Sequence, residues 1–183
     1  MHLELDAAGR AALLATARES IASNLEARRP SWPPEAERLD YPCGAFVTLR
    51  ERGSLRGCIG RMTSPAPLFE TVRDMARAAA FEDPRFPRLE PEELGSIDIE
   101  ITVLSPLRRI ASASEIEVGR HGVLITKGPR SGVFLPQVAT EQGWDRDRLL
   151  EELCRKAGLP AGSWRSPEAE LQVFEGLAFG EEA

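Results

Sequence analysis

Apolar residues recur every three to four positions in three stretches of the chain, a spacing typical of amphipathic helices. This spacing predicts helices over residues 6–28, 64–81 and 145–157, each with one face turned toward a core. Asp6 and Ser64 stand at the starts of the first two helices, where a side-chain oxygen accepts an otherwise unpaired backbone N–H. We therefore expect both residues to act as N-caps.

Alternation of apolar and polar residues, which is typical of half-buried strands, marks six shorter stretches. These stretches are residues 45–49, 55–59, 97–104, 122–126, 133–135 and 170–179. Short glycine-containing segments separate the first stretch from the second and the fourth from the fifth, so each of these pairs is predicted to form a hairpin. Helices and hairpins in mixed order, without a regular βαβ repeat, predict an α+β fold.

Length and composition bound the size of this fold. With 183 residues and 42% hydrophobic side chains, the chain 1–183 is expected to form one domain without metal or disulfide support. Cys43, Cys58 and Cys154 are an odd number of cysteines at wide spacings, which favours reduced thiols and a cytoplasmic location. No apolar run is long enough to cross a membrane, and the first residues lack signal-peptide features, so we expect a soluble, unexported protein.

Net charge and missing motifs argue against several classes of function. A formal charge of −6 argues against a large nucleic-acid-binding surface, because such surfaces depend on Lys and Arg displacing counterions. The chain has no phosphate-binding loop of the GxxxxGK type, no strand-placed GxGxxG, and no HExxH, GxSxG or CxxC motif. Its two histidines and three cysteines are scattered, so a four-ligand metal site is not expected. The sequence therefore predicts no resident cofactor and no metal.

The strand over residues 55–60 is the best candidate for chemistry. In a regular strand, Arg56 and Cys58 lie on the same face, where a guanidinium would favour the thiolate form of cysteine. Gly57 and Gly60 would leave room for a ligand to approach the backbone closely. The cluster is therefore a candidate nucleophilic or anion-binding site. The alternative, which an isolated cysteine favours, is a small buried thiol with glycines that serve sheet packing.

Two further positions are candidates for completing this site. His121 lies in a loop before a predicted strand and could act as a general base, although a histidine that hydrogen-bonds within its own turn is the simpler interpretation. Glu100, like Asp98, lies on the polar face of the strand over residues 97–104. Either carboxylate would join the site only if that strand neighbours Cys58, and otherwise both are ordinary surface residues.

The run Gly-Ser-Leu-Arg-Gly-Cys-Ile-Gly at residues 53–60 resembles the signature of the AMMECR domain family. Further runs resemble the family's pattern in its order, and they are residues 78–86, 101–105, 119–122, 134–139 and 156–160. The resemblance covers about residues 7–180, which is nearly the whole chain. It implies a mainly antiparallel sheet flanked by helices, with a smaller lobe packed beside it.

The resemblance also suggests partners, although the family name carries no settled reaction. Bacterial and archaeal relatives include protein A of AmmeMemoRadiSam systems, which is encoded alongside a Memo-type protein and a radical S-adenosylmethionine protein. The first hypothesis is therefore a cofactor-free accessory or substrate-handling component of such a system. The second is a cysteine-dependent enzyme that uses Cys58, Arg56 and His121. The third is a protein-interaction module, and the oligomeric state stays open.

Overall fold

The computed structural model describes residues 5–181, which fold into two compact units. The first unit contains residues 5–104 and 177–181, and the second contains residues 105–176. In chain order the main elements are α1 (Ala7–Leu25), β1 (Ala45–Glu51), β2 (Ser54–Arg61), α2 (Leu68–Phe81), β3 (Ile97–Leu104), β4 (Arg108–Arg109), β5 (His121–Lys127), β6 (Arg130–Phe134), α3 (Pro136–Glu141), α4 (Arg146–Lys156) and β7 (Glu170–Gly180). The strand order is β2-β1-β3-β7-β5-β6, with β4 paired to β7. This is the α+β class that the sequence patterns predict, with the mainly antiparallel sheet that the resemblance implies.

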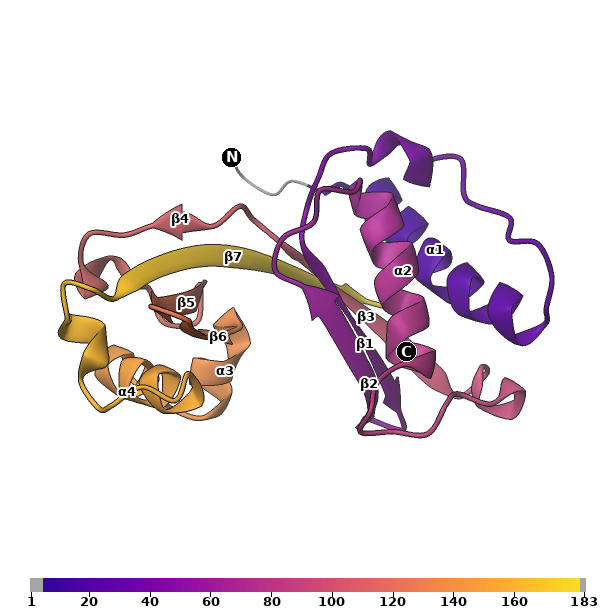
Figure 1. The fold of residues 1–183 in the computed structure, drawn as a ribbon. Coiled ribbons are helices and arrows are strands. Elements are labelled where there is room, and N and C mark those ends of the chain that lie inside the picture. The colour runs from indigo at the N-terminus through magenta and orange to yellow at the C-terminus, as the bar shows by residue number, and fades with distance from the viewer. Residues whose placement is uncertain (1–4, 182–183) are drawn as a thin grey trace. The chain divides into compact units, whose positions relative to one another are not determined.

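In the first unit, β1 pairs with β2 on one side and with β3 on the other, both antiparallel. Helices α1 and α2 lie together against one face of these strands (Figure 1). The core between the helices and the sheet is aliphatic, and its fully buried members include Leu13, Ile21, Val47, Leu49, Leu68, Val72, Ile99 and Ile101. Alternate residues of β1 and β3 therefore supply the core, as their sequence alternation predicts.

The two predicted helix starts in this unit have different outcomes. Asp6 caps α1 as expected, and its carboxylate accepts the N–H of Gly9 at 2.7 Å. The cap predicted at Ser64 is wrong, because α2 begins at Leu68. Prolines follow Ser64 and Ala66 directly, and a residue before proline is disfavoured in helical conformation.

The last residues of the first unit bind back to its beginning. The carboxylate of Glu181 accepts two hydrogen bonds from the guanidinium of Arg18 in α1, from Nε at 2.6 Å and from Nη2 at 2.5 Å. The same carboxylate accepts the N–H of Ile99 in β3 at 3.0 Å. Residues 177–181 are thereby tied to both α1 and β3.

The second unit contains the β5–β6 hairpin, which pairs through β5 with residues 170–175 of β7. Helix α4 begins after Asp145, whose carboxylate accepts the N–H of Arg148 at 2.8 Å. The sequence missed α3 and β4, which are six and two residues long. Elements of that length are too short for a periodic pattern to reveal.

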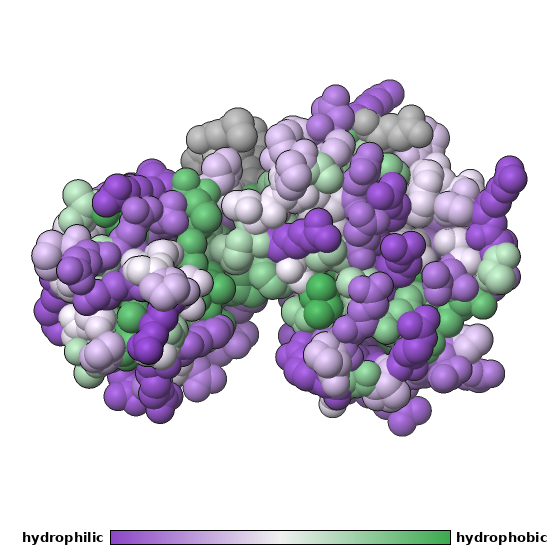
Figure 2. Space-filling view, in the orientation of Figure 1, coloured by the Kyte–Doolittle hydropathy of each residue, from purple (hydrophilic) through white to green (hydrophobic). Residues whose placement is uncertain are grey.

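The face of each unit seen in Figure 2 carries mostly hydrophilic residues, with smaller hydrophobic patches between them. Among residues 5–181, no helix combines the length and the apolar character needed to cross a bilayer.

Helix α2 crosses strand β2 at very short range, and Gly57 makes this possible. A Cβ atom placed on Gly57 would lie 2.2 Å from the carbonyl oxygen of Ala79, closer than any real contact. The opposing atom belongs to the backbone of α2, so it cannot move aside as a flexible side chain could. A side chain at position 57 would push the helix away from the sheet.

Gly57→Ala is therefore expected to lower the free energy of unfolding by about 2 kcal/mol through overpacking. Gly95→Ala is the matched control, because an added Cβ there meets nothing within 4 Å and its φ is not positive. Urea unfolding of both variants measures the difference. Equal stability of the two variants would show that the α2–β2 crossing relaxes freely.

Candidate functional site

Cys58 lies on β2, which is the edge strand of the sheet in the first unit. It stands opposite Thr48 of β1, and the Thr48 hydroxyl lies 3.2 Å from the Cys58 sulfur. The residue is half-buried, whereas Cys43 and Cys154 are buried, and all three thiols are free. Cys58 is therefore the cysteine placed where a ligand or partner can reach it.

The peptide groups of Cys58 bind a pair of charged side chains from the segment after α2. Its N–H donates to Asp83 Oδ2 at 2.9 Å, and its carbonyl oxygen accepts from Arg85 Nη2 at 3.1 Å. Arg85 also donates to Asp83, from Nε to Oδ1 at 2.9 Å and from Nη2 to Oδ2 at 2.7 Å. We call this arrangement the Asp83–Arg85 clamp.

Asp83 is the buried member of the clamp, with a side chain only 1% exposed. The hydrogen bonds from the Arg85 side chain hold the pKa of the Asp83 carboxyl well below its usual range, and the N–H groups of Cys58 and Arg85 add to the effect. Asp83 is therefore ionised at neutral pH. Its oxygens are already occupied by donors.

The clamp provides the hydrogen-bond partners that a neighbouring strand would provide to the backbone of Cys58. An edge strand directs alternate N–H and C=O groups away from the sheet, and these groups attract other chains if they stay unpaired. At Cys58, a carboxylate accepts the outward N–H and a guanidinium donates to the outward carbonyl. The clamp therefore closes this point of the edge and fixes the backbone that carries the thiol.

Arg56 lies elsewhere than the regular strand alternation predicts. The pairing of β1 and β2 shifts from Leu49 with Gly57 to Arg50 with Leu55, so Arg56 is the extra residue of a β-bulge. The regular alternation that predicted a shared face for Arg56 and Cys58 is therefore interrupted at Arg56. The guanidinium bound at the Cys58 peptide belongs to Arg85 instead.

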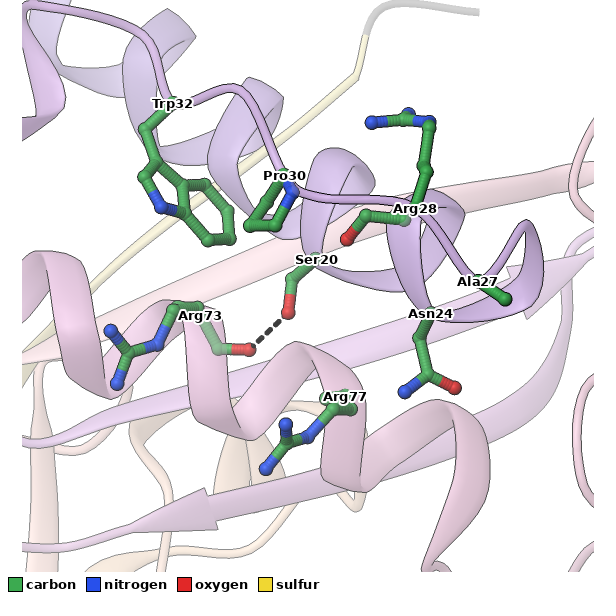
Figure 3. A pocket seen from close by; sticks show the side chains of 9 residues that line it. Ser20, Asn24, Ala27, Arg28, Pro30, Trp32, Arg73 and Arg77 are labelled. Carbon is green, nitrogen blue, oxygen red and sulfur yellow. Dashed lines mark hydrogen bonds between the residues drawn. The ribbon is translucent and has the colours of Figure 1, made fainter.

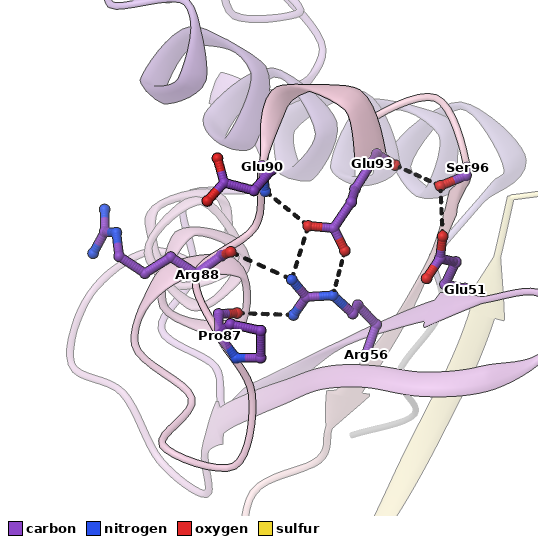
Figure 4. Close-up of polar contacts among 7 residues, drawn as sticks. All are labelled: Glu51, Arg56, Pro87, Arg88, Glu90, Glu93 and Ser96. Atoms are coloured by element: carbon purple, nitrogen blue, oxygen red, sulfur yellow. Dashed lines mark hydrogen bonds and ion pairs between the residues drawn. The ribbon is translucent and has the colours of Figure 1, made fainter.

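The buried guanidinium of Arg56 binds the segment that follows α2 (Figure 4). It donates to both carboxylate oxygens of Glu93, at 2.6 and 2.9 Å, and to the carbonyl oxygen of Pro87 at 3.0 Å. The hydrogen bond from Arg56 lowers the pKa of Glu93. Arg56 thus fastens this segment to the edge of β2. A catalytic role for Arg56 stays a prediction.

At Gly57 and Gly60, the space that a side chain would fill is already occupied by other parts of the protein. Gly57 faces the backbone of α2, as described above, and a Cβ on Gly60 would lie 2.3 Å from the ring of Phe46. Close packing within the protein therefore accounts for glycine at both positions. Ligand contact at Gly57 and Gly60 stays a prediction.

Strand β3 pairs with β1 and not with β2, so Glu100 does not neighbour Cys58 directly and lies in line with it across three strands. Thr48 is opposite Cys58 on one side and opposite Glu100 on the other, so the three side chains share the sheet face that points away from α1 and α2. We call these three residues the Cys58 row. Within residues 5–181, the half-buried Glu100 side chain has no hydrogen bond or ion pair that would occupy it.

His121 belongs to the second unit and is buried there. Its ring Nδ1 accepts a hydrogen bond from the backbone N–H of Glu117 at 3.1 Å. The backbone N–H of His121 donates to the Glu117 carbonyl oxygen at 2.9 Å. The local turn contact that the sequence offered as the simpler interpretation is thus present. Its role as a general base for Cys58 stays a prediction.

Sequence patterns do not identify the residues that contact Cys58, which are Thr48, Asp83 and Arg85. The run Asp-Pro-Arg at residues 83–85 was a usable signal, because an aspartate before proline often follows the end of a helix and organises a turn. The run does not reveal which strand that turn contacts. Among the described residues, no group of three His, Cys, Asp or Glu side chains is placed to hold a metal ion.

Comparisons with known proteins extend the resemblance over most of the chain. The AMMECR1 family model matches residues 14–179. The chain is 42% identical to Protein NEQ441 of Nanoarchaeum equitans, over 91% of this chain and 97% of that protein. It is 41% identical to Protein MK0488 of Methanopyrus kandleri, over 93% and 87% of the two chains. The crystal structure of the uncharacterized protein PH0010 from Pyrococcus horikoshii superposes with a TM-score of 0.83 at 37% identity, covering 93% of this chain and 90% of that one.

Asp83→Asn is expected to lower the free energy of unfolding by about 2 kcal/mol at neutral pH, because the amide replaces a buried acceptor of charge-assisted hydrogen bonds. The depressed pKa of Asp83 means that the folded state binds fewer protons than the unfolded state. The wild type should therefore keep this contribution above about pH 4, the unfolded value, and lose it as the pH falls further.

Urea unfolding at a series of pH values measures this effect. The wild type should lose more stability than Asp83→Asn as the solution is acidified. Asp40→Asn is the matched control, since Asp40 is exposed in a loop of the same unit. If the two variants have the same stability and the same pH slope, the clamp does not stabilise the fold.

Proposed function

This chain belongs to the AMMECR1 family, and from that premise we propose that it is the cofactor-free accessory or substrate-handling component, protein A, of an AmmeMemoRadiSam-type system. Its partners would be the Memo-type protein and the radical S-adenosylmethionine protein of that system. Its recognition surface would be the sheet face that carries the Cys58 row.

The observation that carries this proposal is that both carboxylate oxygens of Asp83 in the clamp already accept hydrogen bonds from the protein. A general base works best when its pKa lies near the operating pH, whereas the pKa of Asp83 is held far below it. Both oxygens of Asp83 already accept hydrogen bonds from the Cys58 backbone or from Arg85. The surroundings of Cys58 therefore suit a rigid presenting surface better than proton transfer.

The composition of this face also supports recognition. It combines the half-buried Thr48 and Cys58 with Leu55, which is 39% exposed and shares their face through its pairing with Arg50. A fixed surface of mixed apolar and polar side chains loses little conformational entropy on binding. The three free thiols support the cytoplasmic location expected from the sequence.

A cysteine-dependent enzyme is the second candidate, favoured by the contact between the Thr48 hydroxyl and the Cys58 sulfur at 3.2 Å. In this alternative Cys58 is the nucleophile and Arg85 supplies the nearby positive charge. His121 remains the candidate base that the sequence suggested.

The first proposal predicts a complex with the Memo-type or the radical S-adenosylmethionine protein encoded in the same genome. We expect Leu55→Glu to weaken that complex at least ~10-fold, because it places a charge on the recognition surface. Isothermal titration calorimetry with the purified partners measures the effect.

The second unit offers a matched control in Val118, which is 38% exposed. Val118→Glu introduces the same charge and should leave the affinity unchanged. Absence of a complex with either protein contradicts the partnership. A complex that tolerates Leu55→Glu contradicts the assignment of the surface.

The second candidate predicts that iodoacetamide modifies Cys58 at least ~10-fold faster than Cys43 or Cys154 near neutral pH. Burial raises the pKa of the Cys43 and Cys154 thiols, so both are poor nucleophiles there. Peptide mass spectrometry measures the three rates. Arg85→Gln should slow the reaction of Cys58, because it removes the positive charge that is bound at the Cys58 carbonyl. A Cys58 as slow as the buried thiols rules this candidate out.

A further inference from the structure

A separate cavity of about 330 Å³ opens in the first unit between the end of α1, the segment that follows it and α2 (Figure 3). It shares no residue with the Cys58 row or with the clamp. Its lining consists of Ser20, Ser23, Asn24, Ala27, Arg28, Pro30, Trp32, Arg73 and Arg77. The volume lies within the range of small-molecule sites in proteins.

Three arginines and no carboxylate line this cavity. Glu19 and Glu26 occupy the guanidinium of Arg28. Arg73 donates from Nε to Asp74 at 2.8 Å, and its Nη2 lies 3.7 Å from the carboxylate of Glu70. Within the described part of the chain, Arg77 has no hydrogen bond or ion pair. Arg77 and part of Arg73 therefore remain available to an anion.

The spacing of these two arginines along α2 also suits an anion. Arg73 and Arg77 are four residues apart on α2, so their side chains project from the same face of the helix. Two like charges at this spacing repel each other. An anion bound between them removes that repulsion and accepts hydrogen bonds from both guanidinium groups.

Aromatic and amide groups provide a different kind of wall. The ring of Trp32 packs edge-on against Phe69, with ring centroids 5.6 Å apart, and this contact holds it in place. Pro30 adds a second rigid apolar surface, and the Asn24 side chain offers both a donor and an acceptor. These groups suit a planar ring with polar edges.

We propose that this cavity binds an organic phosphate of mononucleotide size. Arg73 and Arg77 hold the phosphate, Trp32 contacts the ring, and Asn24 bonds to its polar edge. The site requires neither the thiol of Cys58 nor a partner protein, so it is a property of the first unit beyond the proposed function.

Titration with adenosine monophosphate, followed by tryptophan fluorescence, tests this proposal. Trp144 and Trp164 belong to the second unit, so a saturable change that disappears in Trp32→Phe reports the cavity. Arg77→Gln should weaken binding by ~10-fold or more, because it removes a charge-assisted hydrogen bond to the phosphate. Arg77 is exposed, so the substitution should leave the fold intact. Arg29→Gln is the matched control, since Arg29 is exposed nearby but does not line the cavity.

Two simpler compounds separate the parts of the ligand. Inorganic phosphate and adenosine should each bind more weakly than adenosine monophosphate, because each lacks one half of the contacts. Equal affinity for adenosine overturns the role of the arginines, and equal affinity for phosphate overturns that of the ring. The proposal also fails if adenosine monophosphate gives no saturable change, or if Arg29→Gln and Arg77→Gln weaken binding equally.

Discussion

The hydrogen bond from the Cys58 N–H to the carboxylate of Asp83 joins the edge of the sheet to the segment that leaves α2. Its position follows from the crossing of α2 over Gly57, because α2 ends at Phe81 and Asp83 comes two residues later. The outward groups of an edge strand require partners, and here side chains provide them. Arg56, also on β2, attaches the same segment to the edge strand through its ion pair with Glu93. The segment after α2 thus covers part of the edge that a further strand would otherwise occupy.

Much of the fold follows from patterns in the sequence, and the details of the site do not. The β1–β2 hairpin, β3 and α4 agree with periodic patterns, because each buries one face over several residues. The bulge at Arg56 depends on a single extra residue, which leaves no periodic signal.

Gly57 illustrates a second limit of the sequence. Glycine in a strand indicates a close approach, but it does not say whether a ligand or a helix approaches, and here the backbone of α2 does so. The contact of Asp83 with Cys58 spans 25 residues of sequence, so no local pattern reveals it. What identifies the site is the pairing of backbone groups, which only the folded chain displays.

The attachment of Glu181 to Arg18 has a consequence for how the protein is made. These residues lie 163 positions apart, and the whole second unit is encoded between the two parts of the first. A ribosome that synthesises the chain in order completes residues 105–176 before Glu181 exists. The unit that begins first during translation is therefore finished last, and until then α1 and β3 lack the carboxylate that binds both.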